Sequence, residues 1–102
     1  MARTPIHPGE ILADELEETG LSAKRLADLI EMPANRLYQL IAGKRSMTTD
    51  TALRLSQYFG TSADLWMNLQ AAYDLDLARQ QNGKAIRRIP RRTEKAEPRP
   101  AA

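Results

Sequence analysis

Apolar residues recur at intervals of three and four through most of this chain, and polar residues occupy the positions between them. This spacing lines up apolar side chains on one face of a helix, whereas a half-buried strand would alternate at every second residue. The pattern predicts five helices, over about residues 9–19, 22–30, 33–41, 50–59 and 62–80. No strand pattern competes before residue 83, so we expect an all-α fold.

The predicted helix ends coincide with residues that favour such positions. Pro8 suits a first helical turn, which has no use for its missing N–H. Ser22 and Thr49 are good N-caps for the second and fourth helices. Pro33 breaks the helical pattern and suits a new start. Three of the helices are followed by a glycine, which readily adopts left-handed backbone: Gly20, Gly43 and Gly60.

The second and third helices are joined by a turn of two or three residues, so they must cross steeply. Ala27 is small enough to let the third helix pack closely. This geometry is that of a helix-turn-helix, whose second helix can lie in the major groove of DNA. The exposed positions of that helix are then Ala34, Asn35, Tyr38 and Gln39, with Arg36 on the flank.

The residue types at these positions suit DNA. Asn and Gln can pair with adenine and Arg with guanine, each giving about 1–3 kcal/mol of discrimination. Cations that follow the third helix can contact phosphates, as can the start of the second helix, where the helix dipole favours an anion. Tyr38 either contacts a phosphate or packs on the turn. The predicted DNA-binding set is Ser22, Lys24, Ala34, Asn35, Arg36, Tyr38, Gln39, Lys44, Arg45 and Ser46.

The net charge of +2 conceals an alternation along the chain. The net charge is −4 over residues 1–21, +3 over 22–54, −2 over 55–83 and +5 over 84–102. The net positive part of the predicted helical region therefore coincides with the helix-turn-helix, which favours nucleic-acid binding. The acidic side of the first helix is either a solvated face or a dock for a basic partner.

The fifth predicted helix has a wider apolar face than a small core requires. It either caps the domain or also forms a dimer or partner interface. Trp66 suits the core, with one edge available to an interface. The predicted interface set is Trp66, Leu69, Tyr73, Leu77, Ile86 and Ile89.

The composition changes at Asn82-Gly83. We expect a helix-turn-helix domain over residues 1–82 and a basic tail over residues 83–102. Residues 84–89 could form a short strand, followed by a disordered stretch rich in proline and charge. The tail either solubilises the protein, grips DNA phosphates or orders on a partner.

Other classes of function fit poorly. The 102 residues contain no cysteine and one histidine, so we expect no metal, no cofactor, no small-molecule substrate and no catalytic site. His7 is expected to anchor the start of the first helix, together with Glu10. No apolar run approaches the roughly 20 residues that span a membrane, and no signal-peptide core is present. We expect a cytoplasmic protein.

Several motifs together resemble those of the HigA family of antitoxins, in the lambda-repressor-like (XRE) helix-turn-helix group. The resemblance runs from about residue 5 to residue 78. It is carried by His7-Pro8-Gly9-Glu10-Ile11-Leu12, Leu21-Ser22, Leu26-Ala27, Ala42-Gly43-Lys44-Arg45, Thr48, Ala52-Leu53-Arg54-Leu55, Phe59-Gly60-Thr61 and Leu65-Trp66-Met67-Asn68-Leu69-Gln70.

The resemblance implies a five-helix fold, a homodimer on an operator with two half-sites, and repression of the protein's own operon. It also implies a RelE-like toxin of the HigB type, an mRNA endonuclease that the antitoxin neutralises.

Three positions depart from the family's pattern. Glu31 stands where the wider group often has glycine, and Ala23 and Ala34 replace polar residues that many relatives use on DNA.

Two other functions remain open at this point. The chain could be a stand-alone XRE-type repressor without a toxin partner. It could also be a protein-interaction domain that has lost DNA binding, which the alanines at Ala23 and Ala34 would favour.

Overall fold

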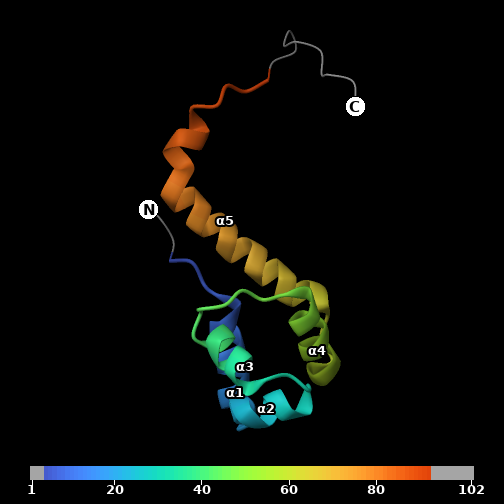
Figure 1. Cartoon of the computed structure of the whole chain (residues 1–102). Helices are drawn as coiled ribbons and strands as arrows, with labels where there is room; N and C mark the ends of the chain where they lie inside the picture. The colour runs from blue at the N-terminus through green and yellow to red at the C-terminus, as the bar shows by residue number, and fades with distance from the viewer. Residues whose placement is uncertain (1–3, 93–102) are drawn as a thin grey trace.

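The computed structural model describes residues 4–92, which form five helices and no strand (Figure 1). The helices are α1 (Pro8–Thr19), α2 (Ala23–Leu29), α3 (Ala34–Ile41), α4 (Thr49–Phe59) and α5 (Ala63–Arg87). The predicted all-α fold is confirmed. Helices α1 to α4 gather at one end of the molecule, and α5 leaves this group and extends away from it (Figure 1).

The helices begin where side chains can accept the unpaired N–H groups of a first turn. The imidazole of His7 accepts from Gly9, while the backbone N–H of His7 donates to Glu10, so both expected anchors of α1 are confirmed. Ser22 caps α2 as predicted. The cap of α4 is Thr48, and the expectation of Thr49 is wrong by one residue, since Thr49 is the first helical residue.

The core lies among α1 to α4 and the first turns of α5. Leucines from four helices are almost fully buried and fill its centre: Leu12, Leu26, Leu37, Leu40 and Leu55. Trp66 closes the core from α5, with 3% of its surface exposed. Burial of each such side chain contributes about 1.5–3 kcal/mol to folding, so this core fixes how α2 and α3 cross.

Helix α5 is longer than predicted and replaces the expected strand. Its final turns include residues 84–87, so the strand at 84–89 is wrong. Residues 4–92 contain no strand, so a strand at residues 84–89 would have had no partner to pair with. Ile86 and Ile89 are three positions apart, which suits a helix, and Lys84 and Arg87 lie at the helix C-terminus, where the dipole favours cations. The predicted boundary at Asn82-Gly83 falls inside α5.

Among the described residues, no helix is both long and apolar enough to cross a membrane. The expected disorder of the tail concerns mainly residues 93–102, which lie outside the described residues.

Candidate nucleic-acid interface

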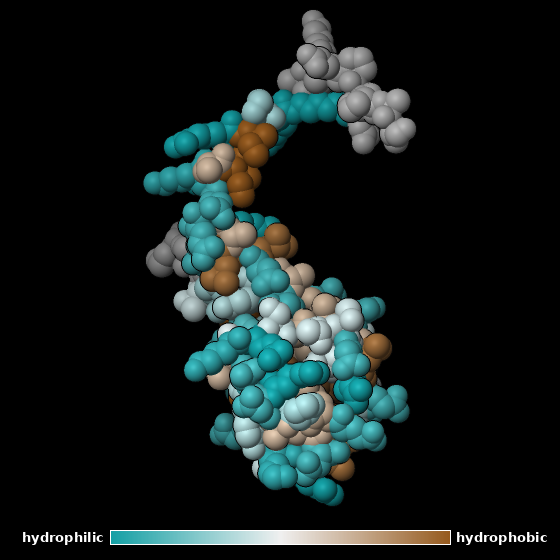
Figure 2. All heavy atoms as spheres, viewed as in Figure 1, coloured by the Kyte–Doolittle hydropathy of each residue, from teal (hydrophilic) through white to brown (hydrophobic). Residues whose placement is uncertain are grey.

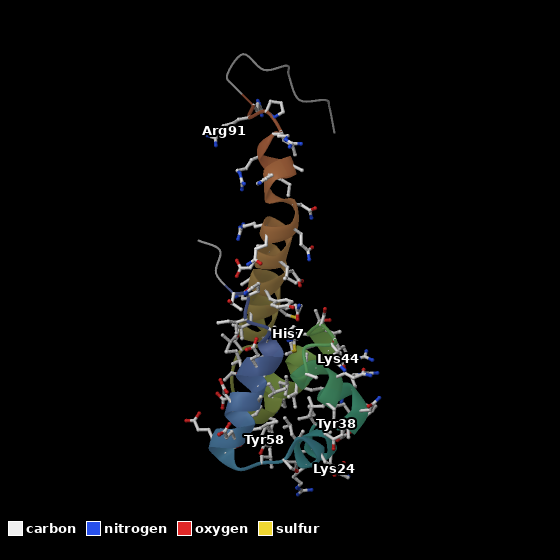
Figure 3. The ribbon with its side chains drawn as sticks, turned by 90° about the vertical axis from the view of Figure 1, so that its left-hand side faces the viewer. His7, Lys24, Tyr38, Lys44, Tyr58 and Arg91 are labelled. Atoms are coloured by element: carbon white, nitrogen blue, oxygen red, sulfur yellow. The ribbon has the colours of Figure 1, made fainter. Side chains whose placement is uncertain are left out.

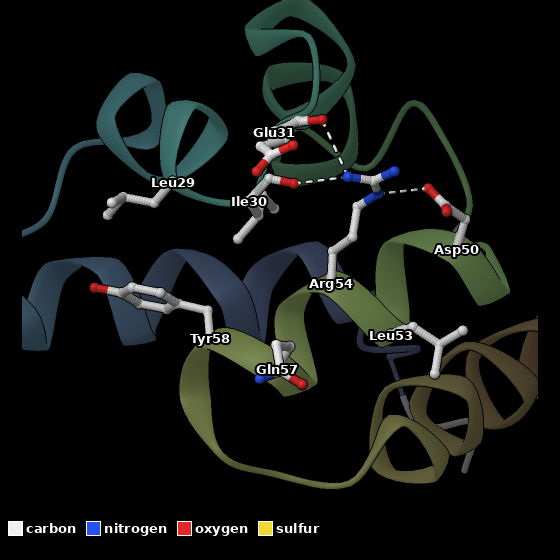
Figure 4. A pocket seen from close by; sticks show the side chains of 8 residues that line it. All are labelled: Leu29, Ile30, Glu31, Asp50, Leu53, Arg54, Gln57 and Tyr58. Carbon is white, nitrogen blue, oxygen red and sulfur yellow. Dashed lines mark hydrogen bonds and ion pairs between the residues drawn. The ribbon is translucent and has the colours of Figure 1, made fainter.

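The turn between α2 and α3 is held in an unusual backbone conformation. Glu31 has a φ of 58°, the left-handed region that a residue with a Cβ rarely adopts. The guanidinium of Arg54, on α4, donates to the carbonyl oxygens of Ile30 at 2.9 Å and Glu31 at 3.1 Å. Asp50 accepts from the same guanidinium at 2.9 Å. Figure 4 shows this clamp at the edge of the groove between α2 and α4.

Helix α3 presents a polar face to solvent and buries the opposite face. Leu37 and Leu40 are in the core, whereas Asn35, Arg36 and Tyr38 are exposed. Ala34 and Gln39 are half-buried. Asn35 and Arg36, whose side chains can read base edges through hydrogen bonds, therefore lie in the first turn of α3, where a helix entering the major groove makes such contacts.

The chain reverses direction immediately after α3. Gly43, with a φ of 75°, donates to the carbonyl of Leu40, and Lys44 donates to the carbonyl of Gln39 at 2.9 Å. This pair of bonds is a Schellman motif, which closes the end of a helix and turns the chain back. It places the exposed residues Lys44, Arg45 and Ser46 beside the last turn of α3.

Arg45 is bonded to a residue of α3. Its Nε and Nη2 donate to the side-chain oxygen of Gln39, at 3.0 and 2.8 Å. Residue types alone predict a phosphate contact for Arg45 and a base contact for Gln39. In the structure the two side chains are instead bonded to each other.

The far end of this loop is tied to α5. The buried side chain of Gln70 accepts a hydrogen bond from the backbone of Met47 at 2.7 Å and donates to Asp74 at 3.0 Å. The loop of residues 42–48 is thus bonded to α3 at its start and to α5 at its end. Such anchoring reduces the conformational entropy that the loop would lose on binding.

The start of α2 lies near the same side of the domain. Figure 3 shows Lys24, Tyr38 and Lys44 along one side of the view. The hydroxyl of Ser22 accepts from the backbone of Arg25 at 3.1 Å and so acts as a cap. Lys24 pairs with Asp28 at 3.4 Å, with both side chains mostly exposed. An exposed pair of this kind is worth about 0–1 kcal/mol, so it does not prevent Lys24 from contacting a phosphate.

The start of α1 packs against the end of α3. A Cβ at Gly9 would overlap the carbonyl of Leu40, so the two helices approach more closely than any other residue would allow. The ring of His7 meets the ring of Tyr73 edge to face, with centroids 4.8 Å apart. His7 therefore joins the start of α1 to helix α5, and its ring lies near the turn at Gly43, where an added Cβ would meet it at 3.8 Å.

The predicted interface residues on α5 separate into three groups. Trp66 is in the core, as expected, and its burial leaves little surface for a partner. Leu69, Tyr73 and Leu77 are half-buried. Ile86 and Ile89 are exposed over 52% and 67% of their surface. Figure 2 shows apolar side chains on the extended part of α5, away from the helical group.

Sequence reasoning missed the positioning roles of Arg54, Gln70 and Gly9. All three lie in the motifs that carry the family resemblance, which was the available signal. Their roles depend on contacts across 20 or more residues, and no local pattern reveals such contacts. Among residues 4–92, no group of three histidine or carboxylate side chains could hold a metal ion.

Comparison with known proteins agrees with this geometry. A family model described as "Helix-turn-helix" matches residues 12–66. Virulence-associated protein I of Dichelobacter nodosus is 49% identical over 76 residues, covering 74% of this chain and 70% of that protein.

Two solved structures are similar over most of the chain. An addiction module antidote protein of a HigA family from Coxiella burnetii is 46% identical with a TM-score of 0.84, covering 89% of this chain and all of that one. Pseudomonas aeruginosa antitoxin HigA, solved with the higBA promoter, is 43% identical with a TM-score of 0.81, covering 85% of this chain and 96% of that one. The chain therefore belongs to the helix-turn-helix family, and within its lambda-repressor-like (XRE) group to the HigA family of antitoxins.

Proposed function

We propose that this protein is the antitoxin of a toxin–antitoxin module. It binds operator DNA as a homodimer, represses its own operon and neutralises a RelE-like toxin of the HigB type. The observation that carries the DNA-binding part is the exposed polar face of α3, which is flanked by the anchored cations Lys44 and Arg45. The relative from Pseudomonas aeruginosa, solved with a promoter, supports the same function.

In this proposal α3 lies in the major groove. Asn35 pairs with adenine and Arg36 with guanine, as the donors and acceptors of these side chains allow. Lys44 and Ser46 contact phosphates on one side, and Ser22, Lys24 and the hydroxyl of Tyr38 contact them on the other. These contacts fix the register of α3 without reading sequence.

The homodimer forms through α5. Most of the stability of a helix in a protein comes from packing of its apolar face, and the exposed isoleucines Ile86 and Ile89 lie beyond the reach of the core. Helix-turn-helix dimers bind two half-sites about one helical turn of DNA apart, roughly 34–36 Å, so in this proposal the second copy presents its α3 at that spacing.

The toxin docks on a surface other than α3. An enzyme that binds RNA needs a basic surface, and the exposed carboxylates of Asp14, Glu17 and Glu18 on α1 offer the complementary charge. Because this acidic face lies on α1, the antitoxin can hold DNA and toxin together. We also place the protein in the cytoplasm, where its DNA and toxin are.

Two measurements test this proposal. Fluorescence anisotropy with the DNA upstream of the protein's own gene should show salt-sensitive binding that the double variant Arg36→Ala/Gln39→Ala loses. Co-expression with the product of a neighbouring short reading frame should give a complex that copurifies and abolishes mRNA cleavage. DNA binding without any toxin complex would instead favour a stand-alone repressor.

A further inference from the structure

The side chains of Gln39 and Arg45 form a pair whose outward groups are all donors. The side-chain oxygen of Gln39 has two lone pairs. It accepts two hydrogen bonds from Arg45, from Nε at 3.0 Å and from Nη2 at 2.8 Å. The amide orientation follows from chemistry, since a guanidinium has no acceptor and must face the oxygen.

This pairing changes what Gln39 can read. A glutamine that recognises adenine donates to N7 and accepts from the N6 amino group through its side-chain oxygen. In this structure that oxygen is already saturated, and the amide nitrogen of Gln39 keeps two N–H groups. Arg45 adds its remaining N–H groups, so the pair can donate but cannot accept.

The pair is held in place from both sides. Lys44 donates to the backbone carbonyl of Gln39, so the residue before Arg45 is tied to the same residue that Arg45 contacts. Gln70 fixes Met47 two residues after Arg45. Hydrogen bonds to a charged group are also stronger than those between neutral groups. Arg45 is therefore already directed at Gln39 before DNA arrives.

We propose that Gln39 and Arg45 together select guanine in the operator. Guanine presents two acceptors in the major groove, N7 and O6, which match a donor-only pair. Adenine presents a donor beside its acceptor, and that donor would face another donor. This inference rests on the proposed function, and it replaces the adenine contact and the phosphate contact that residue types alone predict for Gln39 and Arg45.

The test is selection of DNA sequences from a randomised duplex library by the full chain. The same selection with Gln39→Ala identifies the operator position that Gln39 reads, as the position at which the preference is lost. At that position the unmodified protein should prefer guanine to adenine by about tenfold or more, within the range expected for one good base contact.

The informative variant is Arg45→Ala. Removal of the guanidinium frees the oxygen of Gln39, so the preference at that position should shift towards adenine. Lys44→Ala is the matched control, since it removes the same charge from the neighbouring residue but leaves the pair intact. It should lower affinity for all sequences and keep the guanine preference.

Base analogues give a second readout. Hypoxanthine keeps both major-groove acceptors and should bind like guanine, whereas 7-deazaguanine lacks one and should bind more weakly. Two results would overturn the inference while leaving DNA binding intact. One is a preference of the unmodified protein for adenine at the position that Gln39 reads, and the other is an unchanged guanine preference in Arg45→Ala. Failure to enrich any sequence would overturn the proposed function itself, and the inference with it.

Discussion

Gly9 at the start of α1 lies directly against the backbone carbonyl of Leu40, in the last turn of α3. Leu40 is almost fully buried, and its carbonyl also accepts the hydrogen bond of Gly43 that closes the helix. Close packing of one backbone against another therefore sets the position of α3 relative to α1.

Gly9→Ala should destabilise the protein. The added methyl group meets a backbone oxygen that cannot move alone, so overpacking should cost about 1–3 kcal/mol in free energy of unfolding. For a domain of this size that is a fall of roughly 4–8 °C in Tm for each kcal/mol. Thermal denaturation followed by circular dichroism measures it.

Gly83→Ala is the matched control. Gly83 lies within α5, and a Cβ there meets the far end of the flexible Arg87 side chain at 3.0 Å. Alanine in a helix interior is favoured over glycine by about 0.5–1 kcal/mol, so Tm should stay constant or rise. Equal Tm values for the two variants would contradict the packing of α1 on α3.

Glu31 offers a test of backbone strain. With φ at 58°, a residue with a Cβ costs about 1–3 kcal/mol, and glycine avoids this cost. Glu31→Gly should therefore raise the free energy of unfolding by about 1 kcal/mol after the entropy of the unfolded glycine is counted. Glu31→Val should lower it, since β-branched residues fit this region worst. Chemical denaturation should rank glycine above the native residue and valine below it; any other order refutes the strain.

Gln70→Leu should weaken the loop that follows α3. The variant leaves the buried N–H of Met47 without its partner, at a cost of about 1–3 kcal/mol in stability. It should also lower DNA affinity, because Lys44 and Arg45 lose one of the anchors of their loop. Asn68→Ala, an exposed change on the same helix, should alter neither Tm nor the Kd for DNA. If Gln70→Leu binds DNA with native affinity, the anchor is irrelevant to binding.

Ile86→Glu/Ile89→Glu should dissociate the homodimer without unfolding the monomer. Both side chains are exposed and contribute nothing to the core, whereas carboxylates buried between two copies would be strongly unfavourable. Sedimentation velocity should show a monomer for this variant and a dimer for Gln81→Glu, an exposed change on the same helix. A dimer that survives the double substitution would place the interface elsewhere.

Sequence reasoning was most successful where one segment determines its own structure. The caps at His7 and Ser22 and the turns at Gly20 and Gly60 follow from local preferences, and the structure contains all four. Glu31 stands where the wider group often has glycine, and its positive φ is a conformation that glycine adopts without strain.

Sequence-based predictions failed where contacts between residues far apart in the chain determine the structure. Residues 84–89 resembled a strand because two isoleucines stand among cations, yet a strand requires a neighbour to pair with, and a helix already running through Gly83 can simply continue. Arg45 and Gln39 are six residues apart, which is not a helical contact spacing, so their pairing depends on the turn at Gly43. Both cases required the fold before they could be inferred.

The central claim is that α3 reads DNA while the loop after it grips phosphates. Its most direct test is the salt dependence of binding to the protein's own upstream DNA, for the native chain, Lys44→Ala and Asn35→Ala. Lys44→Ala should bind all sequences more weakly and lower the slope of log affinity against log salt by about one. Asn35→Ala should keep the slope and lose discrimination between the operator and unrelated DNA. An unchanged slope in Lys44→Ala together with undiminished discrimination in Asn35→Ala would contradict the account.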